Sequence, residues 1–104
     1  MRIKKLDQVY TKDNVHLGKA HCLYHRTTEI RPEWGYYATY VYMVSFQLGD
    51  DYYVPTDFIA GRDPHNGHII LTVTEKKVAN NTWTRLPDFV ARGDASKEEL
   101  AERE

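Results

Sequence analysis

The sequence predicts an all-β fold, a small and partly open antiparallel β-barrel followed by an irregular or helical C-terminal extension. The main observation is the stretch of residues 36–48, in which every even-numbered residue is apolar or aromatic. Successive side chains of an extended chain point to opposite faces, so this period of two indicates one long strand. We expect its even-numbered side to form the inner wall of the sheet. Turn signals at 49–51 and 63–67 divide the following residues into short strands, and 104 residues suit a single domain.

Short strands and a loop are expected before the long strand. Residues 12–14 favour a turn, because their Asp and Asn side chains bond the local backbone and tolerate left-handed conformations. Gly18 permits a bend or bulge. Residues 27–35 contain a proline, a glycine and several charges, which indicates an exposed loop with one helical turn over 32–34. The strands expected in this part are 5–10, 15–17 and 19–26.

After the first hairpin turn, short strands alternate with turns. Residues 52–54 form the return strand, which ends at Pro55 because proline cannot donate to a β-ladder. The sequence Asp-Pro-His-Asn-Gly at 63–67 is typical of a tight turn. Thr74 is the expected N-cap of a short helix, and Ser96 opens a capping-box pattern that predicts a charged C-terminal helix or a frayed tail. A short turn or helix at 56–60 and a strand at 68–74 complete the expected elements.

Composition and charge exclude several classes of partner. The 14 basic and 15 acidic side chains give a net charge of −1, so no long-range field draws the chain to nucleic acid or to anionic lipid. No segment approaches the ~18–20 apolar residues of a membrane span. Cys22 is the only cysteine, and no apolar stretch of the secretory type follows the N-terminal charges. We therefore expect a cytoplasmic protein without nucleic-acid or membrane partners.

Two stretches of the sequence resemble the PRC-barrel domain, the small β-barrel of the photosynthetic reaction-centre H subunit and of the ribosome-maturation factor C-terminal domain. The first is VYTKDNVHLGKA at 9–20, similar to the strand–turn–strand opening of the family. The second is YVPTDFI at 53–59, similar to the Val-Pro step of the family, and the apolar run at 69–73 follows it.

The resemblance implies a domain boundary and a class of function. It covers roughly residues 5–79, which predicts a PRC-barrel-like domain at 1–79 and leaves 80–104 as an extension that packs on the barrel. The family implies a non-catalytic adaptor or docking module of a prokaryotic protein that often self-associates. It has no shared catalytic residues to transfer, so it implies neither a catalytic site nor a cofactor.

Aromatic residues indicate where such a module would bind protein. Tyr37, Val41 and Met43 share the odd-numbered side of the long strand, an apolar set too large for ordinary solvent exposure. Trp83 and Phe89 lie in the C-terminal extension. Two explanations remain open: either the extension covers this face, or a second subunit does. We predict a homodimer that uses these five residues as its interaction surface.

The alternative hypothesis is a β-barrel that binds a small ligand in a pocket near Tyr40, Tyr42 and Cys22. Such a barrel could also be an enzyme. A nucleophilic cysteine needs an adjacent base, and the neighbouring His21 would point to the opposite face of a strand. Metal binding has weak candidates in His65 and His68, which flank the Asn-Gly turn without a cysteine or a well-spaced carboxylate beside them. We therefore predict no catalytic residues, no metal and no cofactor.

Overall fold

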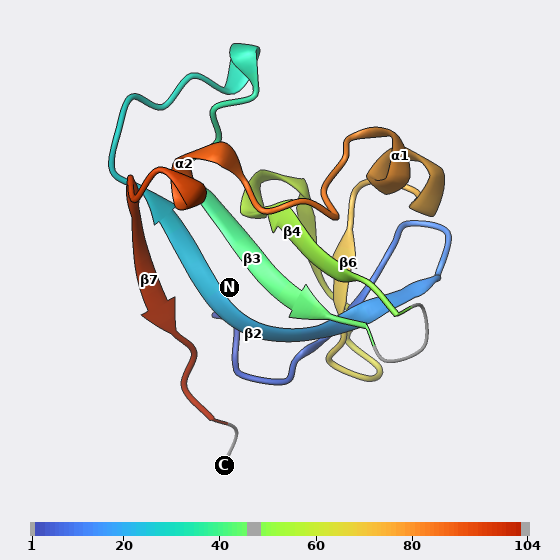
Figure 1. Cartoon of the computed structure of the whole chain (residues 1–104). Helices are drawn as coiled ribbons and strands as arrows, with labels where there is room; N and C mark the ends of the chain where they lie inside the picture. Colours follow the sequence, from blue (N-terminus) through green and yellow to red (C-terminus); the bar gives the residue numbers. More distant parts are fainter. Residues whose placement is uncertain (1, 46–48, 103–104) are drawn as a thin grey trace.

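A computed structural model describes residues 2–45 and 49–102 of the chain, and these residues are mostly β-sheet, as predicted (Figure 1). The described strands form one sheet with the order β4-β3-β2-β1-β6-β5, and β7 also pairs with β2. All pairs are antiparallel except β1 with β6, which is parallel. The strands are β1 (Gln8–Tyr10), β2 (His16–Arg26), β3 (Thr39–Val44), β4 (Asp51–Pro55), β5 (Ile59–Arg62), β6 (Ile69–Leu71) and β7 (Ala95–Glu99). The helical segments are η1 (Pro32–Trp34), η2 (Thr56–Phe58), α1 (Glu75–Asn80) and α2 (Asp88–Ala91).

The long strand β2 is the centre of the sheet. One of its edges pairs with β3, while its other edge pairs with β1 over the first residues and with β7 over the last. Figure 1 shows β2 curving through the molecule, and register shifts mark irregularities in its ladders with β1 and β3. Such bulges increase the bend and twist of a strand. The predicted strands 15–17 and 19–26 are therefore one continuous, curved element.

The sheet is open within the described residues, because no ladder joins its end strands β4 and β5. The short helix η2 connects these two strands along the chain. The all-β class is confirmed as a curved, open sheet.

The core lies on the opposite side of β3 from the one predicted. Val41 and Met43 are buried, and Val54 of β4 and Leu71 of β6 belong to the same apolar cluster. On the even-numbered side, Tyr36 lies outside the strand and is exposed. The prediction of the inner face is wrong because both sides of β3 carry large apolar residues. Phe46 and Leu48, the last two residues of the predicted inner wall, lie outside the described residues.

Several local predictions are confirmed. Pro32 begins the expected helical turn, and Gly67 takes a positive φ of 75° in the tight turn before β6. The Thr74 side chain accepts a hydrogen bond from the backbone N of Lys77 and caps α1. Residues 56–60, however, divide into η2 and the start of β5 rather than forming one turn.

The C-terminal part differs most from its prediction. The segment that begins near Ser96 is the strand β7 and not a charged helix, because it pairs with the free edge of β2 from Ala95 to Glu99. This pairing makes part of the predicted extension at 80–104 a component of the sheet. Neither α1 nor α2 has the length and apolar character that crossing a membrane requires, and the same holds for every helix in the described part of the chain.

Candidate functional site

The five residues predicted as an interaction surface are mostly covered by the chain itself. Val41 and Met43 lie in the core, and Trp83 and Phe89 are buried as well. Tyr37 is half-buried, and its ring centroid lies 5.3 Å from that of Phe58. The prediction is wrong for the four buried residues, because they offer no exposed side chain to a second subunit.

Trp83 and Phe89 show how the C-terminal residues cover the sheet. The carbonyl oxygen of Trp83 accepts a hydrogen bond of 2.7 Å from the backbone N of Tyr53, at the outer edge of β4. Phe89 of α2 packs on Tyr40 with 5.4 Å between ring centroids, and the Arg26 guanidinium lies 4.2 Å from the Phe89 ring centre. Trp83 belongs to the same core cluster as Val41 and Met43, so the C-terminal residues contribute to covering that side of the sheet.

An exposed apolar surface occurs instead on the arm, which we define as residues 27–38 between β2 and β3. Figure 1 shows the arm in cyan, projecting beyond the sheet at the top of the view. It is an ordered hairpin, because the backbones of Arg31 and Tyr36 exchange two hydrogen bonds of 2.8 Å and η1 forms its tip. Gly35 takes a positive φ of 78° where the chain turns back.

Three large apolar side chains of the arm face solvent. Trp34 is 64% exposed, Ile30 is 50% exposed and Tyr36 is 46% exposed. The ring of Trp34 meets that of Tyr36 edge-on, and the guanidinium of Arg31 lies 5.1 Å from the Trp34 ring centre. Glu29 accepts a hydrogen bond of 2.6 Å from Arg31. Exposed apolar patches of this kind mark interaction sites in monomeric proteins, and an anchor that is already ordered loses little entropy on binding.

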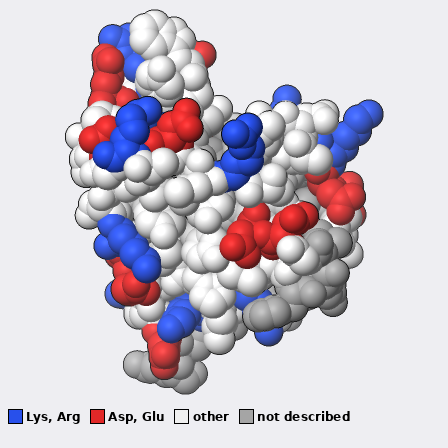
Figure 2. Space-filling model, viewed as in Figure 1, with Lys and Arg blue, Asp and Glu red and all other residues white. Residues whose placement is uncertain are grey.

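A second aromatic surface, the tyrosine face, comprises Tyr24, Tyr42 and Tyr53 on adjacent strands. Tyr42 and Tyr53 are stacked with 5.0 Å between ring centroids, and Tyr24 lies within 6.5 Å of both. In Figure 2 the middle of this side of the sheet, over β2 and β3, is free of charged side chains. Burial raises the pKa of Tyr42 to about 12, with the hydrogen bond to Asp51 and the negative charge of Asp51 adding to the effect.

The predicted ligand pocket near Tyr40, Tyr42 and Cys22 is wrong in its location. Tyr42 and Cys22 occupy paired positions on the side of the sheet away from the core. Tyr40 lines a hollow of about 410 Å³ beside α2 whose wall includes neither of the other two residues. Cys22 is buried, and burial raises the pKa of its thiol, so it is a poor nucleophile.

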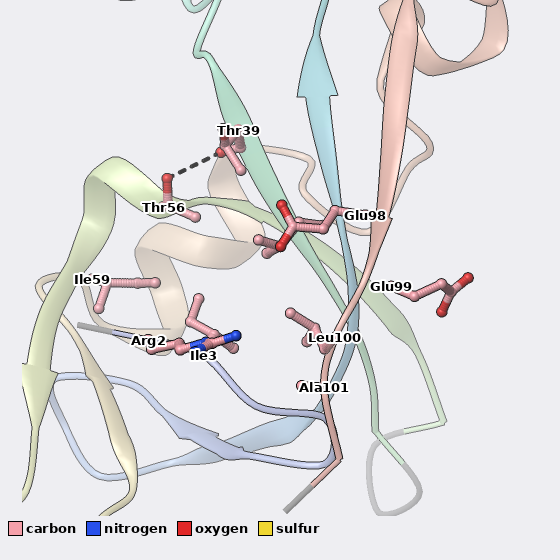
Figure 3. Close-up of a pocket in the computed structure, with 10 residues that line it drawn as sticks. Arg2, Ile3, Thr39, Thr56, Ile59, Glu98, Glu99, Leu100 and Ala101 are labelled. Carbon is pink, nitrogen blue, oxygen red and sulfur yellow. Dashed lines mark hydrogen bonds between the residues drawn. The ribbon is translucent and has the colours of Figure 1, made fainter.

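A further hollow lies on the core side of the sheet, below β7. It measures about 550 Å³ and is formed by five parts of the structure that are distant in sequence. Figure 3 shows the N-terminal segment, β3, η2 with the start of β5, and β7 around it. The residues that line it are Arg2, Ile3, Leu23, Thr39, Thr56, Ile59, Glu98, Glu99, Leu100 and Ala101.

A polar chain runs across three strands at the rim of this hollow. The Nε2 atom of His25 lies 2.8 Å from Oε1 of Glu98, and its Nδ1 atom lies 2.9 Å from Oγ1 of Thr39. A neutral imidazole satisfies both partners when Nε2 carries the proton, because the carboxylate can only accept while the Thr39 hydroxyl can donate to Nδ1. The carboxylate–imidazole–hydroxyl order is that of an activated nucleophile. His25 and Glu98 are open to solvent, however, and their chief effect is to fix the Glu98 carboxylate at the rim.

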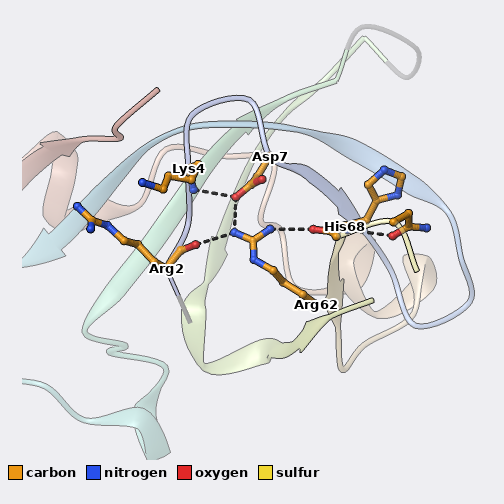
Figure 4. A network of polar contacts seen from close by, with 7 residues as sticks. Arg2, Lys4, Asp7, Arg62 and His68 are labelled. Carbon is orange, nitrogen blue, oxygen red and sulfur yellow. Dashed lines mark hydrogen bonds and ion pairs between the residues drawn. The ribbon is translucent and has the colours of Figure 1, made fainter. Parts of the chain in front are cut away.

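The N-terminal wall of the hollow is held by a buried ion pair (Figure 4). Asp7 is buried, and its Oδ2 atom accepts hydrogen bonds of 2.6 Å from Arg62 and 2.7 Å from the backbone N of Lys4. Arg62 also donates to the carbonyl oxygens of Arg2 at 2.6 Å and Gly67 at 2.8 Å. The guanidinium of Arg62 therefore fixes the backbone of the N-terminal segment against β5.

The weak metal candidates His65 and His68 do not come together with further ligands. The ring of His68 stacks on Tyr10 with 4.9 Å between centroids, and His16 stacks on Tyr10 as well, at 4.8 Å. The backbone N of His65 bonds the side chain of Asp63 in the turn. Among residues 2–45 and 49–102, no three His, Cys, Asp or Glu side chains are placed to hold a metal ion.

Sequence reasoning missed both the arm and the hollow as candidate sites. Trp34 stands in a charged loop, and an isolated exposed tryptophan there was the available signal. The sequence contained no comparable signal for the hollow, because His25 and Glu98 at its rim are 73 residues apart in the chain. Comparison with protein-family models, with curated proteins and with solved structures finds no match to this chain.

Proposed function

We propose that this chain is a non-catalytic protein-interaction module of the PRC-barrel type, cytoplasmic and self-associating. The observation that carries the proposal is the arm, which holds Trp34, Ile30 and Tyr36 in solvent on an ordered hairpin. The PRC-barrel assignment is based on the sequence resemblance at 9–20 and 53–59. The single, buried Cys22 agrees with a reducing compartment.

The partner that fits the arm best is a second copy of the arm. A two-fold axis places the same patch of both subunits in contact, so the patch must be complementary to itself. Arg31 stands beside Glu29 and Glu33, with nitrogen–oxygen distances of 2.6 and 3.6 Å. Both signs of charge therefore flank the apolar side chains, and a neighbouring arm can pair its acids with Arg31.

The expected dimer is weak, because the arm is small. An interface built from three large side chains falls at the low end of specific protein–protein contacts, below about 1,200 Å² in total. We therefore expect a dissociation constant on the order of micromolar. The net charge of −1 adds little repulsion between copies.

The test is the oligomeric state as a function of concentration. Sedimentation velocity of the wild-type chain is expected to show a monomer–dimer equilibrium, and Trp34→Ala is expected to be monomeric throughout. Leu86→Ala is the control, since Leu86 is also a large exposed apolar residue, at 46%, but lies outside the arm. A wild-type chain that stays monomeric at high concentration, or a Trp34→Ala variant that dimerises as well as the wild type, would contradict the proposal.

A second candidate function is the binding of a small ligand. The observation that favours it is the hollow of about 550 Å³ on the core side of the sheet, within the size range of small-molecule sites. It does not involve Trp34, so both functions can be tested separately.

A further inference from the structure

We infer that the hollow below β7 binds a small zwitterion with an apolar side chain, such as a free aliphatic α-amino acid. This goes beyond the proposed self-association and rests on different residues. The hollow combines an apolar floor with one anionic and one cationic side chain on different walls. These three features match the aliphatic side chain, the ammonium group and the carboxylate of such a ligand.

The apolar floor comes from four separate elements. Ile3 belongs to the N-terminal segment, Leu23 to β2 and Ile59 to β5, while Leu100 directly follows β7. Leu100 is part of the core cluster, and the other three pack against that cluster while remaining partly open. An aliphatic ligand side chain placed there would bury apolar surface on an already rigid base, which is favourable.

Glu98 supplies the anionic wall. It pairs with Leu23 across the β2–β7 ladder and so shares the core side of the sheet, whereas Glu99 pairs with Cys22 on the other side. Figure 3 shows the Glu98 side chain directed into the hollow and the Glu99 carboxylate pointing away from it. The bond from His25 uses one of about four acceptor positions of the Glu98 carboxylate, which leaves acceptors for an ammonium group.

Arg2 supplies the cationic wall. Its backbone is held by the hydrogen bond from Arg62, which is itself paired with the buried carboxylate of Asp7 (Figure 4). A guanidinium binds a carboxylate through two parallel hydrogen bonds. A ligand with only an ammonium group would meet an unpaired like charge at Arg2, and a ligand with only a carboxylate would meet one at Glu98. A zwitterion avoids both.

The first measurement compares four ligands by isothermal titration calorimetry with the wild-type chain. L-leucine is expected to bind. Leucinamide lacks the carboxylate and N-acetyl-leucine lacks the ammonium group, and each is expected to bind roughly tenfold more weakly, because each loses a charge-assisted hydrogen bond. L-serine keeps both charges but lacks the apolar side chain and is expected not to bind detectably. Absence of leucine binding at millimolar concentration, or equal binding of leucine and N-acetyl-leucine, would overturn the inference.

The second measurement compares two neighbouring acids. Glu98→Gln is expected to weaken leucine binding roughly tenfold, by the same loss of a charged acceptor. Glu99→Gln removes the same charge from a carboxylate that points away from the hollow (Figure 3) and is expected to weaken leucine binding less than Glu98→Gln does. Equal effects of the two variants would overturn the assignment. If Glu98→Gln fails to fold, the ligand series on the wild-type chain still decides the matter.

A third variant separates this inference from the proposed function. Trp34→Ala is expected to bind leucine like the wild type, whether or not the chain dimerises. If neither the wild type nor Trp34→Ala binds leucine while the wild type dimerises, the small-ligand assignment is refuted and self-association stands. If both bind leucine while the wild type stays monomeric, the inference stands and the proposed self-association is refuted.

Discussion

Replacing Gly18 with alanine is expected to separate β2 from β3. A Cβ atom at Gly18 would lie 2.4 Å from the carbonyl oxygen and 2.7 Å from the carbonyl carbon of Val44. Ordinary contacts of a Cβ atom begin near 3.4 Å, so the two strands must move apart by about 1 Å. The atoms in the way belong to the backbone of the adjacent strand, and no side-chain rotation can relieve the clash.

The cost follows from overpacking in a buried region. Such insertions destabilise proteins by about 1–3 kcal/mol, and a backbone clash belongs at the upper end, about 3 kcal/mol. Alanine also lowers the conformational entropy of the unfolded chain, which offsets about 0.4–1 kcal/mol of this loss in stability. The net loss in the free energy of unfolding is about 2 kcal/mol, which corresponds to a fall in Tm of roughly 8–16 °C for a domain of this size.

The assay is urea unfolding followed by tyrosine and tryptophan fluorescence, supported by thermal melting. Gly67→Ala is the control, because a Cβ there meets nothing within 4 Å and the cost is confined to its positive φ of 75°. That cost is about 1 kcal/mol. A Gly18→Ala variant as stable as the wild type, or less affected than Gly67→Ala, would refute the close approach of the strands.

Two further predictions concern charged and titrating groups. Asp7→Ala is expected to lower the free energy of unfolding by roughly 3 kcal/mol in urea titrations, because the Arg62 guanidinium loses its carboxylate partner. A free energy of unfolding equal to that of the wild type within error would contradict the buried ion pair. The raised pKa of Tyr42 means that its contribution to stability is complete below pH 10 and is lost as the pH rises toward about 12. Burial also raises the pKa of Tyr24 and of Tyr53, so absorbance titration should show a late transition whose amplitude falls by one tyrosine in Tyr42→Phe. An unchanged amplitude in that variant would disprove the assignment.

Local chemistry made some elements predictable from the sequence. The Thr74 cap, the proline at the start of η1 and the positive φ of Gly67 depend on residues within a few positions of one another. A side chain that bonds its own backbone, or a ring that fixes φ, acts in any surrounding structure. These elements therefore appear where they were expected.

The two main errors arose from contacts between distant parts of the chain. Alternation in β3 showed a period of two but could not tell the inner from the outer side, because Tyr42 on one side and Met43 on the other are both large and apolar. The pattern after Ser96 fits a helix locally, yet the edge of β2 offers a full ladder to the same residues. Tertiary pairing overrides weak local preference in such a case.

The candidate hollow was beyond sequence reasoning for the same reason. Its two charged walls come from Arg2 and Glu98, near opposite ends of the described chain. The exposed loop at 27–35 was predicted, and η1 within it is confirmed. The binding role proposed for the arm is based on the exposure of Trp34, which the sequence pattern does not show.

The position of β7 also bears on how the protein is made. Because β7 pairs with residues 22–26 of β2 and His25 bonds Glu98 across 73 residues, this part of the β2 edge stays open until residues 95–99 have left the ribosome. A nascent chain that stalls before this point presents an unpaired strand to its neighbours, the arrangement from which intermolecular sheets grow.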